Sequence, residues 1–457
     1  MNQKTYPKEV FAYLKDKGLK KWELEWIEVS NIDQVIVVPA ISEYENIKNL
    51  LSSLIKNDRS LLQKALLIFV INNSFSSSLE VKEDNKQSLE LLRAIINKSN
   101  SDKFINEISK SKMQIGVVDA SSKGKEFEDK QAGVGLARKI GLDQALKVFD
   151  YSNPAKKVLI SLDADCTVEE NFLHEINKFF KKQNISVANI DFEHNLDRKD
   201  INISRRGIVS YEIYLRHYVI GLLFAGSPYA FHTIGSILVC DNEAYIKAGG
   251  MNTRQAAEDF YFLQKLAKLY TINKIIATKV KPSARESWRV PFGTGKSMTN
   301  YLSNQKDILL YDPDEFIILK KWLELLNSDL SLNPEMLIKE IKKIHSELLN
   351  FLETQNFSKD WNRILYNSKS EKQLNYQRKN WFDAFKTLKL MHHLRDTTFP
   401  MMDIKSGLEK LFRIVGYSGK IDFNNFEIDI DTLYQNYLSE LRILENSFTE
   451  ISPNHDA

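Results

Sequence analysis

Residues 158–167 read Val158-Leu-Ile-Ser-Leu-Asp163-Ala-Asp165-Cys-Thr167. The apolar run predicts a buried strand, and two carboxylates spaced i, i+2 follow where it ends. Such carboxylates are costly unless a cation neutralises them, and Mg²⁺ or Mn²⁺ is the natural partner of their oxygens. The alternative is a turn in which Asp163 or Asp165 caps a helix that begins at Val168. This segment alone leaves both interpretations open.

Further strands and helices alternate on both sides of this segment. Apolar, β-branched runs occur at Val35–Val38, Leu66–Ile71, Ile115–Val118 and Val187–Ile190. Helical patterns lie at Asn46–Ile55, Leu89–Ile96, Leu136–Val148 and Asn171–Phe180. We therefore predict an α/β fold with a mostly parallel sheet flanked by helices, which binds ligands beyond the carboxyl ends of its strands. Between Ser74 and Lys130 we expect one helix and a mobile loop at Lys123–Lys130.

The pattern changes near residue 300. No glycine occurs between Gly295 and Gly407, and apolar residues recur at helical spacing. We expect three parts: an N-terminal helical extension at 1–32, the α/β domain at 33–300 and a helical C-terminal region at 301–457. The aromatic residues of the last part are predicted to be core residues: Trp322, Trp361, Trp381 and Phe385.

Composition excludes several classes of protein. The 457 residues carry a net charge of +3, which gives no basic excess for binding nucleic acid. Two cysteines cannot form a disulfide framework. The N-terminus lacks the apolar core of a signal peptide, and Tyr218–Ala230 is too short to span a bilayer. We expect a cytoplasmic protein without a transmembrane segment and a buried helix at Tyr218–Ala230, with peripheral membrane contact there left open.

Acidic residues also follow two other elements. Glu43 and Glu45 come after the strand that ends at Pro39, and Glu258-Asp259 begin an amphipathic helix. Acids in a first helical turn are stabilised by the helix dipole, which could explain each pair. The functional alternative for the second pair is a general base that deprotonates an acceptor hydroxyl.

Five motifs occur in a characteristic order. They are Pro39-Ala-Ile-Ser-Glu43, Ala137-Arg138-Lys139-Ile-Gly141-Leu142, Asp163-Ala-Asp165, Gly235-Ser236 leading to Gly249-Gly250, and Glu258-Asp259. Together they resemble the family 2 glycosyltransferases of the GT-A fold over residues 33–300. The resemblance implies inverting transfer of a sugar from a nucleotide-diphosphate sugar, with a UDP-sugar favoured, and a Mn²⁺ or Mg²⁺ cofactor.

The resemblance also implies a role for individual residues. Asp259 would be the catalytic base, with Glu258 beside it in the acceptor site. Asp163 and Asp165 would hold the ribose side and the metal, with Asp165 favoured for direct coordination. The donor-binding residues would be Pro39, Ala40, Glu43, Asn72, Arg138, Asp163 and Asp165.

The chain departs from the family pattern at several positions. Asn72 and Asn73 stand where many relatives have acids that read the base, and Lys139 replaces the usual Asn. A loop containing Arg285, Trp288 and Arg289 resembles the post-catalytic loop only loosely. Its arginines either clamp phosphates or lead structurally into the linker. We expect structural roles for His232 and for the pair His392-His393.

Two alternatives remain. Asp163-Ala-Asp165-Cys-Thr167 also matches the nucleophile motif of haloacid-dehalogenase-like phosphohydrolases, in which Asp163 would attack phosphate and Asp165 would serve as acid/base. That motif usually opens its fold, whereas here about 130 residues of strand and helix precede it. The other alternative is a sugar-nucleotide-binding protein without turnover, against which the joint presence of Asp163, Asp165 and Asp259 argues.

Overall fold

A computed structural model describes residues 6–99, 102–182, 184–195, 205–283, 308–419 and 429–451. These residues form two compact units. The first unit contains the described residues up to 195 and those of 233–283. The second contains residues 205–232 and those from 308 onward. The helix at Arg205–Phe224 therefore belongs with the C-terminal helices, although it precedes the last strands of the first unit in sequence.

A nine-stranded sheet forms the centre of the first unit, as far as the structure describes it. Its strands are β1 (Leu24–Trp26), β2 (Gln34–Ala40), β3 (Ala65–Asn72), β4 (Gln114–Ala120), β5 (Val158–Ser161), β6 (Thr167–Val168), β7 (Val187–Phe192), β8 (Leu238–Asp241) and β9 (Asn273–Lys281). Their order is β1-β4-β3-β2-β5-β8-β7-β9-β6. β4, β3, β2 and β5 are parallel, and so are β7 and β9, whereas β1, β6 and β8 pair antiparallel to their neighbours.

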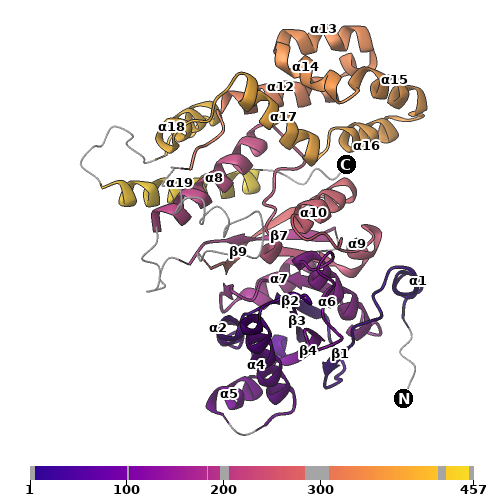
Figure 1. Cartoon of the computed structure of the whole chain (residues 1–457). Coiled ribbons are helices and arrows are strands. Elements are labelled where there is room, and N and C mark those ends of the chain that lie inside the picture. The colour runs from indigo at the N-terminus through magenta and orange to yellow at the C-terminus, as the bar shows by residue number, and fades with distance from the viewer. Residues whose placement is uncertain are drawn as a thin grey trace. The chain divides into compact units, whose positions relative to one another are not determined.

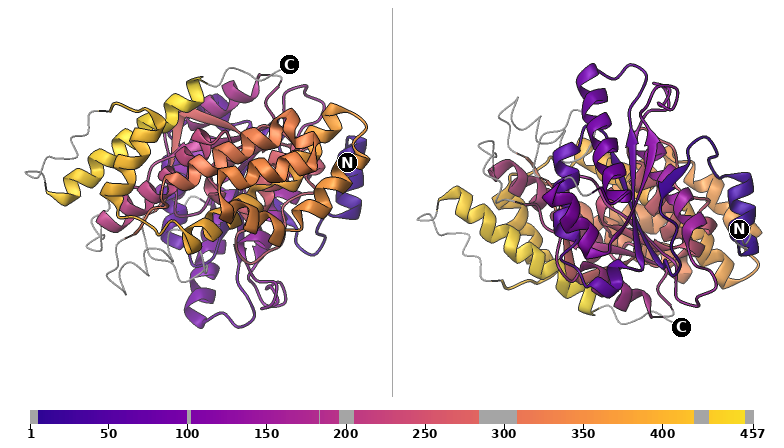
Figure 2. Two further views of the ribbon diagram at one scale, coloured as in Figure 1. Left: turned by 90° about the horizontal axis from the view of Figure 1, so that it is seen from above. Right: turned by 90° about the horizontal axis from the view of Figure 1, so that it is seen from below.

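Helices flank this sheet (Figures 1 and 2). They are α1 (Lys8–Asp16), α2 (Tyr44–Leu54), α3 (Arg59–Leu62), α4 (Leu79–Ile96), α5 (Lys103–Ser111), α6 (Val134–Val148), α7 (Phe172–Phe180), α9 (Asn242–Lys247) and α10 (Glu258–Leu269). Every residue of β2 and β3 is buried, as expected for parallel strands covered on both faces. The predicted α/β fold with a mostly parallel sheet is confirmed.

The predictions of individual strands and helices were confirmed only in part. The expected strands and helices on both sides of Asp163 are present, and the two free cysteines are buried. The prediction of one helix between Ser74 and Lys130 was wrong, because the structure has both α4 and α5 there. The N-terminal extension contributes the edge strand β1 as well as α1, and the Gly235-Ser236 motif forms a 3₁₀ turn before β8. Such three-residue elements are too short for periodicity to reveal.

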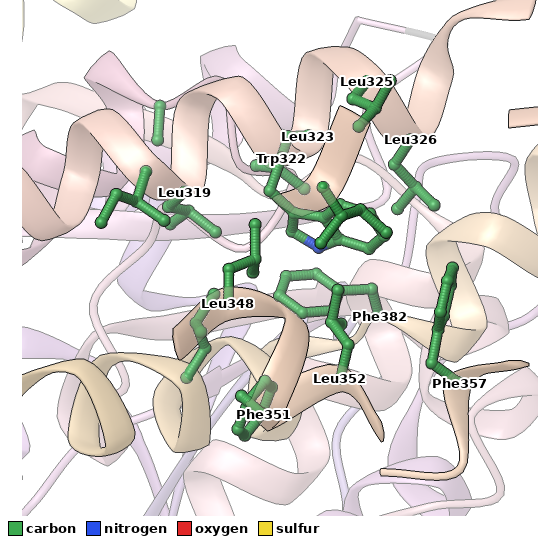
Figure 3. Close-up of a cluster of buried hydrophobic side chains, with 14 of the residues drawn as sticks. Leu319, Trp322, Leu323, Leu325, Leu326, Leu348, Phe351, Leu352, Phe357 and Phe382 are labelled. Carbon is green, nitrogen blue, oxygen red and sulfur yellow. The ribbon is translucent and has the colours of Figure 1, made fainter. Parts of the chain in front are cut away.

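The second unit is helical. Its helices are α8 (Arg205–Phe224), α12 (Asp314–Asn327), α13 (Pro334–Ile344), α14 (Ser346–Thr354), α15 (Phe357–Asn367), α16 (Glu371–Trp381), α17 (Ala384–Thr397), α18 (Ile404–Val415) and α19 (Ile430–Ile451), with a 3₁₀ turn at Asp329–Leu332. Figure 3 shows the buried cluster around Trp322, in which the rings of Phe357 and Phe382 contact the indole edge to face. Trp361 and Trp381 are buried there as predicted, but Phe385 is 38% exposed, so its assignment to the core was wrong.

Helix α8 contains most of the apolar segment for which a buried helix was expected. It packs along α19, and buried ion pairs join the two helices. Arg216 donates to Glu212 at 2.9 Å and to Glu445 at 2.8 Å, and His232 lies 3.1 Å from Glu445. These buried ion pairs show that α8 packs in the interior of the second unit. Among the described helices, none has the length and apolar character needed to cross a bilayer.

Candidate active site

Asp163 and Asp165 follow β5 at the carboxyl edge of the parallel strands. The amide of Leu162 donates to the Val37 carbonyl at 3.1 Å, which fixes the chain just before the acids beside the end of β2. Both acids are partly exposed. The helix-capping alternative was wrong for both, because Thr167–Val168 form strand β6 and α7 begins only at Phe172, after Asn171.

Arg138 joins the two acidic motifs. Its guanidinium is buried on α6 and forms ion pairs with Asp163 and with Glu258. Gly235 makes room for it, since a Cβ there would clash with the guanidinium. Gly135, one turn before Arg138, likewise allows α6 to approach Glu258. The close approaches at Gly135 and Gly235 help to bring Arg138, Asp163 and Glu258 together.

Asp259 lies next to this ion-paired group at the start of α10. Ala257, the residue before the acidic pair, has a left-handed backbone with φ +57°, a conformation that is uncommon without glycine. Burial and the neighbouring Glu258 raise the pKa of Asp259 to about 7. Burial also raises the pKa of Glu258, against the opposing charge of Arg138. A carboxylate whose pKa lies near neutrality suits a general base.

Hydrogen bonds of asparagine side chains connect the ends of β2 and β3. Asn72 is buried and its amide donates to the Ala40 carbonyl at 3.1 Å. Asn85 on α4 donates to the Asn72 carbonyl at 3.0 Å and to the Asn73 side chain at 2.9 Å, and accepts from the Ser42 amide at 2.9 Å. Sequence reasoning missed Asn85, since a polar residue within a helical pattern gives no sign that it faces inward.

Two further predicted donor residues lie beside this network. Pro39 is buried near the end of β2. Glu43 is buried just before α2, and its carboxylate accepts from the Asn46 amide at 2.6 Å rather than capping the helix backbone. Glu45 pairs with Lys48 on the exposed face of α2. Glu43 therefore differs from a simple first-turn acid, whereas Glu45 fits that interpretation.

The carboxylates after β5 are the type of ligand that a hard divalent cation prefers. Asp163 and Asp165 offer carboxylate oxygens at a partly exposed position, which Mg²⁺ and Mn²⁺ accept together with phosphate oxygens and water. Within the described residues, no three acidic, histidine or cysteine side chains are grouped closely enough to hold a metal ion by themselves. A cation bound here would take its remaining ligands from substrate or solvent.

The remaining candidates are three loop residues and three histidines. Arg285, Trp288 and Arg289 fall outside the residues that the structure describes. His232 is buried in the second unit beside Glu445. His393 contacts Glu347 at 2.9 Å, and the His392 ring stacks on Tyr311, so neighbouring histidines point to different partners. The structural role expected for these histidines agrees with these contacts.

Comparisons with known proteins were made for the sequence and for the fold. No family model matches the sequence, and no curated protein matches it. The structure is similar to that of Staphylococcus aureus TarS in complex with UDP-GlcNAc, at 16% identity and a TM-score of 0.37 over 87% of this chain and 98% of that one. It is also similar to the mannosyltransferase PcManGT from Pyrobaculum calidifontis in complex with GDP-Man and Mn²⁺, at 10% identity and a TM-score of 0.35 over 97% and 92% of the two chains. Scores at this level carry no functional argument.

Proposed function

We propose that the protein is a metal-dependent glycosyltransferase of hexosyltransferase type, similar to family 2. It would move a sugar from a nucleotide-diphosphate sugar, a UDP-sugar being favoured, to an acceptor hydroxyl with inversion. The observation that carries the proposal is the arrangement at the carboxyl edge of the sheet. There, Arg138 bridges Asp163 and Glu258, and Asp259 beside them has a pKa of about 7.

Asp259 would perform the proton transfer. Its carboxylate, once deprotonated, accepts the proton of the acceptor hydroxyl as that oxygen attacks the anomeric carbon. Its raised pKa makes it a stronger base than an ordinary aspartate, while a large fraction stays deprotonated at neutral pH. Arg138 would keep Glu258 and Asp163 in fixed positions around it, because a buried guanidinium binds carboxylates with defined geometry.

Asp163 and Asp165 would hold Mn²⁺ or Mg²⁺. When bound, the cation would neutralise the negative charge that develops on the departing diphosphate. Of the two, the family resemblance favours Asp165 as the main protein ligand, while Asp163 pairs with Arg138. The asparagine network of Asn72 and Asn85 would fix the loops after β2 and β3 on the nucleotide side, where Ala40 and Glu43 also lie.

The phosphohydrolase alternative is less well supported by this geometry. A nucleophilic Asp163 needs a carboxylate oxygen in line with phosphorus, and the pairing of its Oδ1 with the buried Arg138 leaves only Oδ2 for this attack. Arg138 is held in turn by Glu258, which has no role in that mechanism. The same ion pairs are compatible with a glycosyltransferase site, in which Asp163 would help to hold the donor and the metal and would not act as a nucleophile.

Thermal-shift measurements with a panel of UDP- and GDP-sugars, with and without Mn²⁺, test the proposal. We expect at least one nucleotide sugar to raise the melting temperature only when the metal is present, because binding to the native state stabilises it. Asp165→Asn should abolish this metal-dependent shift, whereas Glu170→Gln, on the exposed turn before α7, should leave it unchanged. No metal-dependent shift with any donor would refute the proposal.

A further inference from the structure

Three exposed cations lie near α10 in the first unit. We call Lys17, Arg254 and Lys265 the cationic patch. Lys17 ends α1, Arg254 lies in the loop before α10, and Lys265 is on α10 itself. All three residues are exposed, and no ion pair to any of them occurs among the described residues.

Contacts within the first unit position each of these residues. The Lys17 ammonium lies 3.2 Å from the position that a Cβ on Gly249 would take, next to α9. The Arg254 guanidinium stacks 3.9 Å above the centre of the Tyr261 ring, which orients it over α10. Tyr261 and Lys265 are four residues apart and so share one face of that helix.

Neighbouring positive charges also affect the titration of Lys265. Burial lowers the pKa of its ammonium, and so do the charges of Lys17, Arg254 and Lys139. Lys139 is neutralised by Asp143 at 2.9 Å, whereas the described part of the chain provides no such ion pair to the three members of the patch. Bringing like charges together costs free energy, and a bound anion would remove that cost.

One member of the patch, Lys265, lies on the helix that carries the proposed catalytic acids. Lys265 follows Asp259 by six residues, which corresponds to about 9 Å along the axis of α10. The Arg254 loop is tied to the start of this helix, because the Asn252 side chain donates to the Glu258 carbonyl at 2.8 Å. Asp259 and Lys265 lie about 120° apart around the axis of α10, so an acceptor with its hydroxyl at Asp259 would reach the patch past the Arg254 loop and not along one helix face.

We propose that the cationic patch binds a phosphate group of the acceptor, about one sugar unit away from the hydroxyl that receives the transferred sugar. Arg254 would pair with two phosphate oxygens, while Lys17 and Lys265 act as point charges on the same group. This inference deepens the proposed function and rests on it. The phosphate could belong to a soluble molecule or to a lipid headgroup, and the chemistry of recognition is the same for both.

Binding of inorganic tripolyphosphate, measured calorimetrically at low salt with EDTA and without donor, tests the patch directly. The triple variant Lys17→Gln/Arg254→Gln/Lys265→Gln should bind at least tenfold more weakly than the wild type. The matched variant Lys103→Gln/Lys110→Gln/Lys112→Gln removes the same charge from exposed positions at α5 and should bind within twofold of the wild type. The single variant Lys265→Gln, which leaves the Arg254–Tyr261 stack intact, should show an intermediate loss. Equal affinities in all these proteins would overturn the proposal.

Two assays distinguish the sources of the phosphate. Vesicles of phosphatidylcholine with phosphatidylglycerol, compared with phosphatidylcholine alone, report a lipid headgroup, and transfer to glucose 6-phosphate compared with glucose reports a soluble acceptor. The proposal is supported if the triple variant loses binding to the phosphatidylglycerol vesicles or loses the preference for glucose 6-phosphate. It is overturned if the triple variant equals the wild type in both assays. Asp165→Asn should keep its affinity for tripolyphosphate, so failure of donor binding and failure of phosphate binding are observed separately.

Discussion

Asp259 combines two properties that sequence reasoning treated separately, since it begins a helix and is also desolvated. A first-turn acid stabilised only by the helix dipole would have an ordinary or lowered pKa. Here burial and Glu258 together raise the pKa to about 7, and Arg138 opposes the rise. The environment, rather than the residue type, therefore separates the functional interpretation of Asp259 from the capping interpretation.

The rate of transfer should depend on pH through this carboxyl. A base works when deprotonated, so kcat/KM should rise with pH and level off above about 7, losing up to tenfold per pH unit below that value. Asp259→Asn should reduce kcat by about 100- to 10,000-fold and leave donor binding intact. The pH profile of transfer and the donor-dependent thermal shift measure these two effects. A profile that is flat between pH 5 and 8 would remove Asp259 from the role of base.

Glu315 in the second unit gives a pH dependence of stability. It is fully buried on α12, neither carboxyl oxygen has a hydrogen-bond partner among the described residues, and burial together with Asp312 raises its pKa to about 9. The native state therefore keeps a proton that the unfolded chain loses above its usual pKa of 4.5. Between these values the free energy of unfolding should fall as pH rises, by at most about 1.4 kcal/mol per pH unit.

Replacing this carboxyl by an amide tests the assignment. Glu315→Gln cannot ionise, so its stability should decline less steeply from pH 5 to 9 than that of the wild type and should exceed it at pH 8. Glu324→Gln, at an exposed position on the same helix, serves as the control. Urea unfolding at several pH values measures the difference, and parallel curves for Glu315→Gln and the wild type would contradict the buried, protonated state.

At the scale of elements, the N-terminal helix α1 is attached to the helix that carries Arg138. Tyr13 on α1 donates to Asp143 at 2.9 Å and accepts from Lys139 at 2.9 Å, and Tyr245 donates to the same carboxylate at 2.9 Å. Gly250, with φ +76°, leaves space for the Tyr13 hydroxyl, where a Cβ would clash. Lys139, which departs from the family pattern, thus forms part of a buried network.

Removal of one hydroxyl from this network should destabilise the first unit. Tyr13→Phe leaves Asp143 and Lys139 each without one buried hydrogen bond, at a cost of about 1–3 kcal/mol. Tyr6→Phe removes only a 3.4 Å contact to the Lys147 carbonyl and is the matched control. Denaturant unfolding compares the two variants. A Tyr13→Phe protein as stable as Tyr6→Phe would show that the network contributes nothing net.

The sequence was informative where a residue's surroundings follow from its neighbours in the chain. Apolar runs identified β2, β3 and β5, and the acids after β5 marked the carboxyl edge of the sheet. It did not reveal the bridging position of Arg138, because Asp163 and Glu258 are 25 and 120 residues away in sequence. For the same reason Asn85 was missed, and three-residue elements such as β1 carry too little periodicity to be recognised.

At the scale of the whole molecule, the helical C-terminal segment depends on a helix that comes from the middle of the chain. In the second unit, α8 supplies Arg216, which pairs with the buried Glu445 of α19, and packs its Gly221 directly on the ring of Phe316. A chain consisting of residues 308–457 alone would expose these surfaces and leave Glu445 without Arg216.

The fragment 308–457 should therefore not fold cooperatively. An uncompensated buried carboxylate costs about 3–5 kcal/mol, and the lost contacts of α8 add to this. Far-UV circular dichroism should show partial helix content with a broad urea transition, in contrast to the sharp transition expected of the full chain. Arg216→Met in the full chain separates the two contributions, since it keeps the packing of α8 and removes the guanidinium that pairs with Glu212 and Glu445. If the fragment unfolds cooperatively at the midpoint of the full chain, α8 is not part of its fold, and the boundary expected near residue 300 marks an independent domain.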